Sequence, residues 1–479
     1  MTTANVVNQN VLSQRYATPE INAIFSEEGK ILAERELWIA VMKVQRELGM
    51  SIPEEEIAKF ERAKSNIDLA RIAEIEGVTR HDIKAKIQAF VEAAAAGEFL
   101  HQGMTSRDLT DNVEQMQIRK AGEMILGRYI AVAKGLAEKA REYTSIELTA
   151  RTHNQPAELT LLGRRFAMWA EELYENILGF QSFLQQYPLR GIKGPVGTQA
   201  SMLTVLGTDE KVQQLEQRVA DHLGFQRTLQ ATGQIYPRSL DASLVSHLVQ
   251  LGSACSNFAL GMRLMSGYEL VTEGFKERQV GSSAMPHKMN TRTSERITGF
   301  MKLLRMYQEG AAQLSGDQWF EGDVSDSVVR RVIIPDVFYA VDGMSEATLT
   351  VLTEMGVYQK VISREVDRYL PFLATTQILA AAIDAGIGRE EAHATIKRYA
   401  VAEALRMRDG QEQKLAYHLG QDQLFSSHDI TEESIHHILQ ERAALLGNAH
   451  KQIEQVAAKI DVLCQRFPEA AAYQPRQIR

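Results

Sequence analysis

The sequence predicts an all-α protein built around a bundle of long helices. Helical periodicity dominates the chain, and it continues over proline-free stretches such as 111–146. Strand signals are few and short, and several of the 11 prolines lie where loops are expected. Because such stretches are longer than a small globular core requires, we expect the helices to associate in a bundle.

The predicted helices follow one another along most of the chain. One helix face near the N-terminus is indicated by the spacing of Leu37, Val41, Val44 and Leu48. Ala93–Ala96 followed by Gly97 is typical of a helix end. Longer helical stretches are expected over 111–146, 157–187, 238–279, 291–314 and 328–353. Pro156 is interpreted as the first residue of a helix, and Pro335 as an early interruption of the last stretch.

Three domains are expected from a length of 479 residues. The clearest break is the glycine-rich segment 189–199, and boundaries near Thr110 and Arg364 follow the predicted ends of the long helices. The prediction is an N-terminal helical domain (1–110), a central long-helix domain (111–364) and a small C-terminal helical domain (365–479).

Composition excludes several classes of protein. A net charge of -8 and a pI near 5.9 argue against a nucleic-acid partner. The chain has no apolar stretch of membrane-spanning length and no secretory signal pattern at its start, so no membrane association is expected. Two cysteines favour a reduced, cytoplasmic location. The histidines show no metal-ligand spacing, and no cofactor is predicted.

The segment Gly281-Ser-Ser-Ala-Met-Pro-His-Lys-Met-Asn290 lies between two predicted helices. Small residues, two hydroxyls and a following lysine suit a loop that closes over an anion, because successive backbone N–H groups can bind negative charge. A plain linker is an equally good interpretation of the composition alone.

The same segment resembles the GSSxMPxKxN signature of the fumarase/aspartase superfamily at all the specified positions. Ala284 and His287 are most similar to the residues of the adenylosuccinate lyase family. The resemblance implies an all-α, three-domain fold whose long central bundle assembles into a homotetramer. It also implies active sites that take residues from three subunits.

By this resemblance, Ser282 is the general base that removes a proton beside a carboxylate. Lys288 and Asn290 would stabilise the negative charge that develops, and His287 is a rival base on pKa grounds. The block 151–156, RTHNQP, resembles a second family block and implies that His153 is the general acid for the leaving nitrogen.

Further blocks imply residues that bind a nucleotide substrate. The resemblance assigns this role to Arg15, Tyr16, Arg80, His81, Asp82, His101, Thr105, Ser106, Gln234, Arg296, Ser327 and Arg331. The chain departs from the family pattern at Met289, Thr291 and Gly322. An arginine is common at the position of Gly322, and either Arg330 or a neighbouring subunit is expected to replace it.

The implied reaction is the β-elimination of fumarate, from adenylosuccinate to give AMP and from SAICAR to give AICAR. Two alternatives remain open. One is another fumarate-releasing lyase of the superfamily, such as argininosuccinate lyase. The other is a non-catalytic helical scaffold, which the joint presence of Ser282, Lys288 and His153 argues against.

Overall fold

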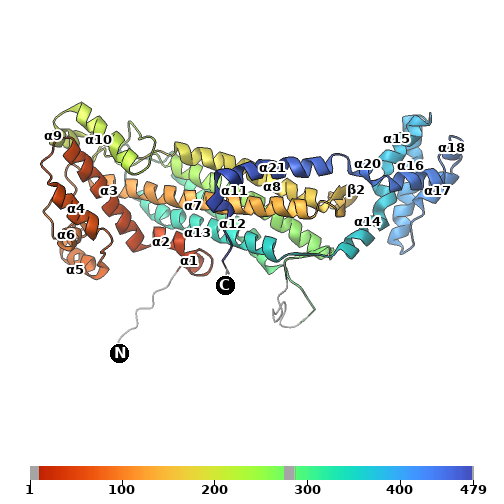
Figure 1. The fold of residues 1–479 in the computed structure, drawn as a ribbon, viewed down its shortest axis with the longest axis horizontal. Helices are drawn as coiled ribbons and strands as arrows, with labels where there is room; N and C mark the ends of the chain where they lie inside the picture. Colours follow the sequence, from red (N-terminus) through yellow and green to blue (C-terminus); the bar gives the residue numbers. More distant parts are fainter. Residues whose placement is uncertain (1–9, 275–284, 286, 477–479) are drawn as a thin grey trace.

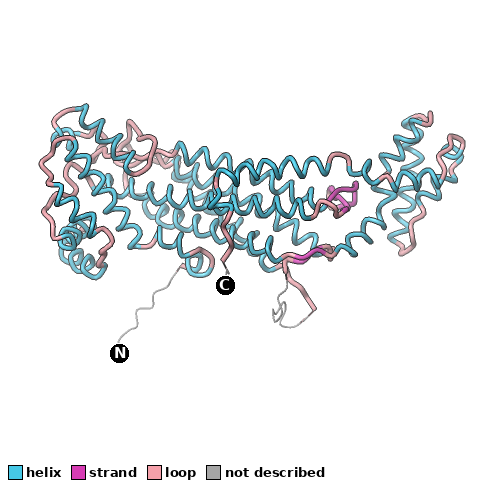
Figure 2. The backbone as a smooth tube through the Cα atoms, viewed as in Figure 1, coloured by secondary structure: helices cyan, strands magenta, loops and turns pink. Residues whose placement is uncertain are grey.

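The protein is an elongated assembly of helices, as Figure 1 shows. The computed structural model describes residues 10–274, 285 and 287–476 of the chain. The N-terminal helices lie at one end, helices α14–α18 lie at the other, and long helices join the two ends. Figure 2 shows how little of the described chain is strand. The predicted all-α class is therefore confirmed.

The N-terminal end packs short helices around α3. The core of this end contains the buried rings of Trp38, Phe60 and Phe90. Helices α9 and α10 join the same core through Met202 and Leu215. The helices of this end are α3 (Glu27–Glu47), α4 (Glu54–Ala63), α5 (Leu69–Thr79), α6 (Asp82–Ala94), α9 (Ala200–Leu206) and α10 (Asp209–His222), whereas α1 (Val11–Arg15) and α2 (Pro19–Phe25) pack against the central bundle.

Long helices form the central bundle and share one apolar core. Buried rings such as Tyr129, Phe166, Phe258 and Phe338 pack between them. Pro335 lies inside a continuous helix, so the predicted interruption is wrong. No helix in the described ranges has the length and apolar character that a bilayer crossing needs. The bundle helices are α7 (Ser106–Glu142), α8 (Leu162–Gln186), α11 (Ser239–Gly267), α12 (Arg292–Leu314) and α13 (Ser325–Glu354).

A β-hairpin occupies the place where a helix was predicted to begin. Strands β1 (Glu147–Thr152) and β2 (Gln155–Leu161) pair antiparallel, and Pro156 lies in β2 rather than at a helix start. The two residues between the strands, His153 and Asn154, have φ of 51° and 60°. Positive φ at both positions is the pattern of a type I′ turn, whose twist suits a tight hairpin.

The helix expected over 238–279 is also shorter than predicted, because α11 ends at Gly267. The chain then enters β3 (Val271–Thr272), which pairs with β4 (Gly356–Val357) after α13. This small sheet ties the segment before the 281–290 loop to the far end of α13.

The C-terminal residues form a small end cluster and then return along the bundle. Helices α15–α19 enclose their own core around Leu415, Phe425 and Ile435. Helix α21 joins the bundle core through Ile453 and Ile460. The elements are α14 (Gln359–Leu373), α15 (Thr375–Asp384), α16 (Arg389–Arg408), α17 (Leu415–Gln421), α18 (Gln423–Ser426), α19 (Glu432–Gln440), α20 (Arg442–Leu446), α21 (Ala449–Arg466) and α22 (Pro468–Ala471).

A buried carboxylate organises the start of α7. Asp108 is fully buried and accepts the Thr105 N–H at 2.8 Å, so it caps the helix that Thr105 precedes. The same carboxylate accepts the guanidinium of Arg190 at 2.6 Å and the Lys193 and Gly194 N–H groups at 2.9 and 3.0 Å. The Asp108 side chain thus joins the glycine-rich segment 189–199 to the central bundle.

We expect Asp108→Asn to lower the free energy of unfolding by about 3–5 kcal/mol, because it leaves the buried Arg190 charge unpaired. The measurement is urea denaturation followed by circular dichroism. Asp384→Asn, at an exposed position at the end of α15, is the matched control and should change little. Equal stability of the two variants would contradict this role of Asp108.

Candidate active site

His101 lies at the N-terminal end of the bundle, five residues before α7 begins. Its Nδ1 accepts the Nε1–H of the buried Trp38 at 3.1 Å. Burial lowers the pKa of His101 below its usual value, and the charge of Asp108 opposes this shift. The ring is therefore neutral near pH 7, and its proton is on Nε2, where it can be donated to an anion.

Five other predicted residues at the N-terminal end lie at or beside the starts of α6 and α7. His81 is the N-cap of α6 and accepts the Lys84 N–H at 3.3 Å, while Asp82 begins the helix. Arg80 ends α5 in the left-handed conformation. Thr105 is the N-cap of α7, and Ser106 is its first residue, so the helix begins five residues earlier than the predicted 111–146 stretch. Helix starts present free N–H groups, which suit a carboxylate or phosphate.

His153 is exposed at the tip of the β1–β2 hairpin. Arg151 holds that tip in place. Its guanidinium donates to the Asn154 carbonyl at 3.2 Å, forms an ion pair with Glu365 of α14 and lies 4.2 Å from the Tyr268 ring centre. Arg151 is part of the 151–156 block that resembles the family. Its contacts hold the hairpin in position within this chain.

The loop at 281–290 is described in part. Ser282 lies outside the described residues, whereas Lys288 is exposed and Asn290 is half-buried. Glu273, which is buried, accepts the N–H groups of Thr293 and Ser294 at 2.8 and 2.9 Å. A carboxylate from one side of the loop therefore caps α12 on the other side. No sequence motif had indicated Glu273.

Tyr16 and Arg296 are brought together. The guanidinium carbon of Arg296 lies 5.4 Å from the Tyr16 ring centre, and Phe300 meets the same ring edge-on at 5.1 Å. Arg15, in the last turn of α1, is exposed beside them. The predicted nucleotide-binding residue Tyr16 thus packs against α12, the helix that follows the 281–290 loop, and Arg15 precedes it in the chain.

The half-buried Gln234 is held by its backbone, since its N–H donates to the Glu321 carbonyl at 2.7 Å. Gly322, in the same contact, has φ of +132°, and an added Cβ would approach Ile235 to 2.9 Å. This backbone disfavours any side chain, which explains why the expected arginine is absent here.

Arg330 does not replace the arginine missing at Gly322. It is buried on α13 and pairs with Asp241 at 2.7 Å and with Glu114 at 2.6 Å. Its guanidinium also donates to the Tyr236 hydroxyl. The suggestion that Arg330 binds substrate is therefore wrong. Ser327 is half-buried and Arg331 is exposed on the same helix.

One subunit does not bring the two predicted site histidines together. His101 precedes α7 and His153 follows it, and α7 contains 37 residues. At 1.5 Å per residue this helix is about 55 Å long. Figure 1 shows the N-terminal helices and the β2 hairpin at opposite ends of the bundle.

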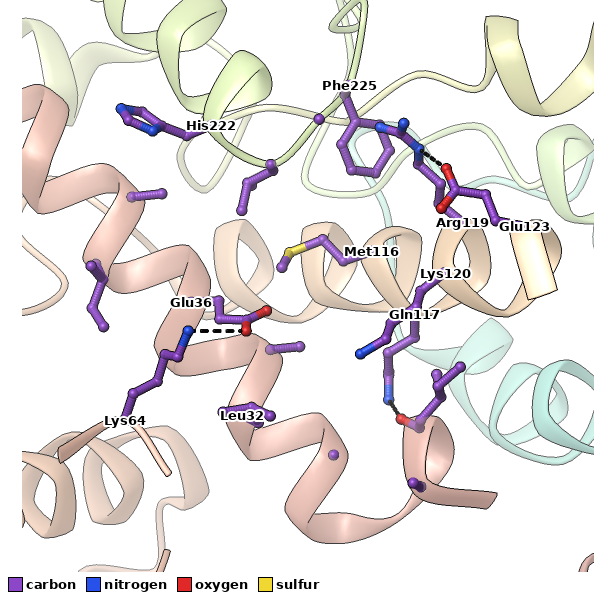
Figure 3. Close-up of a pocket in the computed structure, with 18 of the residues that line it drawn as sticks. Leu32, Glu36, Lys64, Met116, Gln117, Arg119, Lys120, Glu123, His222 and Phe225 are labelled. Atoms are coloured by element: carbon purple, nitrogen blue, oxygen red, sulfur yellow. Dashed lines mark hydrogen bonds and ion pairs between the residues drawn. The ribbon is translucent and has the colours of Figure 1, made fainter. Parts of the chain in front are cut away.

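A cleft of about 680 Å³ between α3 and α7 is a separate feature (Figure 3). None of the predicted site residues lines it. Glu36 and Lys64 form an ion pair there at 3.3 Å, and Arg119 pairs with Glu123 at 3.0 Å. Within the described residues, no group of three or more His, Cys, Asp or Glu side chains is arranged to hold a metal ion.

Solved structures of other proteins share this fold. The structure is similar to a 3-carboxy-cis,cis-muconate lactonizing enzyme from Pseudomonas putida, with a TM-score of 0.79, 19% identity, and 96% of this chain and 100% of that chain covered. It is also similar to a fumarate lyase from Mesorhizobium sp. BNC1, with a TM-score of 0.78, 19% identity and 93% and 99% covered. At these identities the likeness shows the fold, and it confirms the fumarase/aspartase-like architecture.

Sequence comparison defines the class and then the family. Residues 17–303 match the family model described as Lyase. The chain is 33% identical to an adenylosuccinate lyase of Saccharomyces cerevisiae, over 94% of this chain and 93% of that protein. It is 32% identical to an adenylosuccinate lyase of Bacillus subtilis, over 80% and 87%. The chain therefore belongs to the adenylosuccinate lyase family.

The turn that carries His153 generates a prediction about Asn154. We expect Asn154→Val to weaken the hairpin by roughly 1–3 kcal/mol, because a β-branched residue is strained at positive φ. Asn154→Gly is the matched variant and should preserve the turn. Hydrogen exchange of residues 147–161, measured by mass spectrometry, should be faster in the valine variant only. Equal exchange in both variants would argue against the type I′ turn.

Proposed function

We propose that the protein eliminates fumarate from adenylosuccinate to give AMP, and from SAICAR to give AICAR, in purine nucleotide biosynthesis. The observation that carries this proposal is the similarity to adenylosuccinate lyases along nearly the full length of both chains. Ser282, Lys288 and His153 are all present, so the residues required for the chemistry accompany the family membership.

In the proposed mechanism, Ser282 removes the proton from the carbon beside a carboxylate. The C–H electrons move onto that carboxylate, and Lys288 and Asn290 stabilise the resulting negative charge. The C–N bond then breaks as His153 protonates the leaving nitrogen. The products are fumarate and the free nitrogen group, which is the purine amine of AMP or the carboxamide of AICAR, so protons and electrons balance.

The nucleotide part of the substrate is assigned to the remaining predicted residues. Arg15 and Tyr16 would hold the phosphate, since a guanidinium can donate two parallel hydrogen bonds to it. The neutral His101 ring would donate its Nε2–H to an anionic oxygen. The N–H groups at the start of α7 support the same role for Thr105 and Ser106.

We further propose a homotetramer whose sites are shared between subunits. Two observations support it. The two histidines lie at opposite ends of α7. The bundle helices also expose several large apolar side chains, which another subunit would bury in an assembly. These exposed residues are Met168, Leu260, Leu264, Met306, Val328 and Val332.

The three-domain division and a cytoplasmic location complete the proposal. The described cysteines support a reducing compartment, because Cys255 is buried and Cys464 is half-buried, and both are free thiols.

The first test is the assay of purified protein with adenylosuccinate, following AMP and fumarate by chromatography. Ser282→Ala and His153→Ala should each lower kcat by roughly 10²–10⁴-fold, because each removes one proton-transfer group. Substrate affinity should change far less. Argininosuccinate is the control substrate. Fumarate from argininosuccinate and none from adenylosuccinate would reject the proposed function.

Mixing the two inactive variants tests the shared site. After subunit exchange, Ser282→Ala and His153→Ala chains should regain part of the activity, because some sites receive both intact residues. The control mixes Ser282→Ala chains with chains that carry both substitutions, which cannot form an intact site. If hybrids shown by native mass spectrometry remain inactive, Ser282 and His153 do not come from different subunits.

A further inference from the structure

The last described residues of the chain cross the bundle and bind to α7 and α13. The Lys134 Nζ donates to the Ala471 carbonyl at 3.0 Å. The Tyr473 hydroxyl donates to Glu346 Oε1 at 2.5 Å, and the Arg476 N–H donates to Glu346 Oε2 at 2.6 Å. Both carboxylate oxygens of the buried Glu346 are therefore bound by this segment, residues 471–476, which we call the C-terminal strap.

The same stretch of α13 receives the N-terminal segment that contains Arg15 and Tyr16. Asp342, one turn before Glu346, accepts the Thr18 N–H at 2.6 Å. Gly343 lies directly beneath Tyr16, since an added Cβ there would come within 2.8 Å of the Tyr16 Cβ. One short stretch of helix thus supports the predicted phosphate-binding pair and the strap together.

A single buried cation links the two attachments. Arg128 of α7 lies 3.8 Å from Asp342 and 3.9 Å from Glu346, and its guanidinium stacks 3.4 Å from the Tyr473 ring centre. Burial raises the pKa of Asp342 to about 6, and it also raises the pKa of Glu346. Two buried acids that share one cation need further donors, and for Glu346 the strap supplies them.

The strap also reaches the N-terminal segment directly. The Arg476 guanidinium forms an ion pair with Glu20, in the first turn of α2. Glu20 lies two residues beyond Thr18 and five beyond Arg15. The N-terminal segment is therefore fixed on one side by Asp342 and on the other side by Arg476.

We propose that the C-terminal strap is a positioning element that fixes Arg15 and Tyr16 against α12 and α13 and thereby sets the affinity for the phosphate of the substrate. This inference rests on the proposed function for its ligand. Without the strap, Arg128 is drawn to the exposed Glu346 carboxylate, and Asp342 loses the cation that balances it. The contact between Asp342 and Thr18 then weakens, and Arg15 and Tyr16 lose their fixed position.

The test compares Tyr473→Phe with a chain that ends at Ala472. Tyr473→Phe removes one hydrogen bond to Glu346 and keeps the ring, so KM for adenylosuccinate should rise roughly two- to tenfold while kcat stays within about twofold. The shortened chain should show a larger rise in KM. Gln474→Ala, at an exposed strap position, is the matched control and should leave both constants unchanged.

A double-substitution cycle separates positioning from general stability. In an Arg15→Ala background, Tyr473→Phe should raise KM by a clearly smaller factor than in the wild type, because one of the two residues that the strap positions is gone. Additive effects on KM would overturn the proposal. So would an unchanged KM in both strap variants, or a fall in kcat without a change in KM.

Hydrogen exchange tests the strap independently of the reaction. Residues 11–20 should exchange faster in Tyr473→Phe, while the hairpin at 147–161 should not change. If the wild-type protein does not act on adenylosuccinate, the proposed function fails, and the exchange result still decides whether the strap fixes the N-terminal segment. Unchanged exchange at 11–20 would reject the strap.

Discussion

The length of α7 is the constraint on which the rest of the structure depends. A rigid helix of 37 residues separates the segment of His101 from the hairpin of His153. A substrate the size of a nucleotide cannot span that distance. The proposed mechanism uses both histidines and would therefore require a second chain, and in the proposed tetramer the long bundle helices would be the surface along which the chains associate.

Buried charged groups then fix where the ends of the bundle meet the loops. Asp108 fastens the 190–194 turn to α7, and Glu273 joins the two sides of the 281–290 loop. Arg330 connects α7, α11 and α13. Each of these groups has several partners, so it specifies one arrangement of backbone segments. Among the predicted substrate-binding residues, Thr105 and Ser106 lie within one turn of Asp108, and Ser327 and Arg331 lie within one turn of Arg330.

Periodicity was sufficient to predict the long helices, because apolar residues that repeat at helical spacing over several turns fit few structures other than a helix. It could not predict the β1–β2 hairpin, since that turn depends on positive φ at His153 and Asn154 and on the packing of Arg151 against α14. Motif resemblance located the candidate residues, but it could not separate Arg330 from Arg331. Burial among Asp241 and Glu114 makes that distinction, and burial is a property of the fold.

Exposed candidate residues and buried supporting residues have different roles in this structure. Arg15, His81, His153 and Lys288 are exposed in one chain, whereas the groups that hold their segments are buried. In the proposed tetramer, a polar group that binds substrate at a shared site must keep a donor or a charge that its own chain does not use. The backbone that carries such a group must also be fixed within its own chain, because in the proposed shared site the positional error of each subunit would add to that of the others. The polar networks beneath the site, including the contacts of Asp342 and Glu346, meet that requirement within each chain.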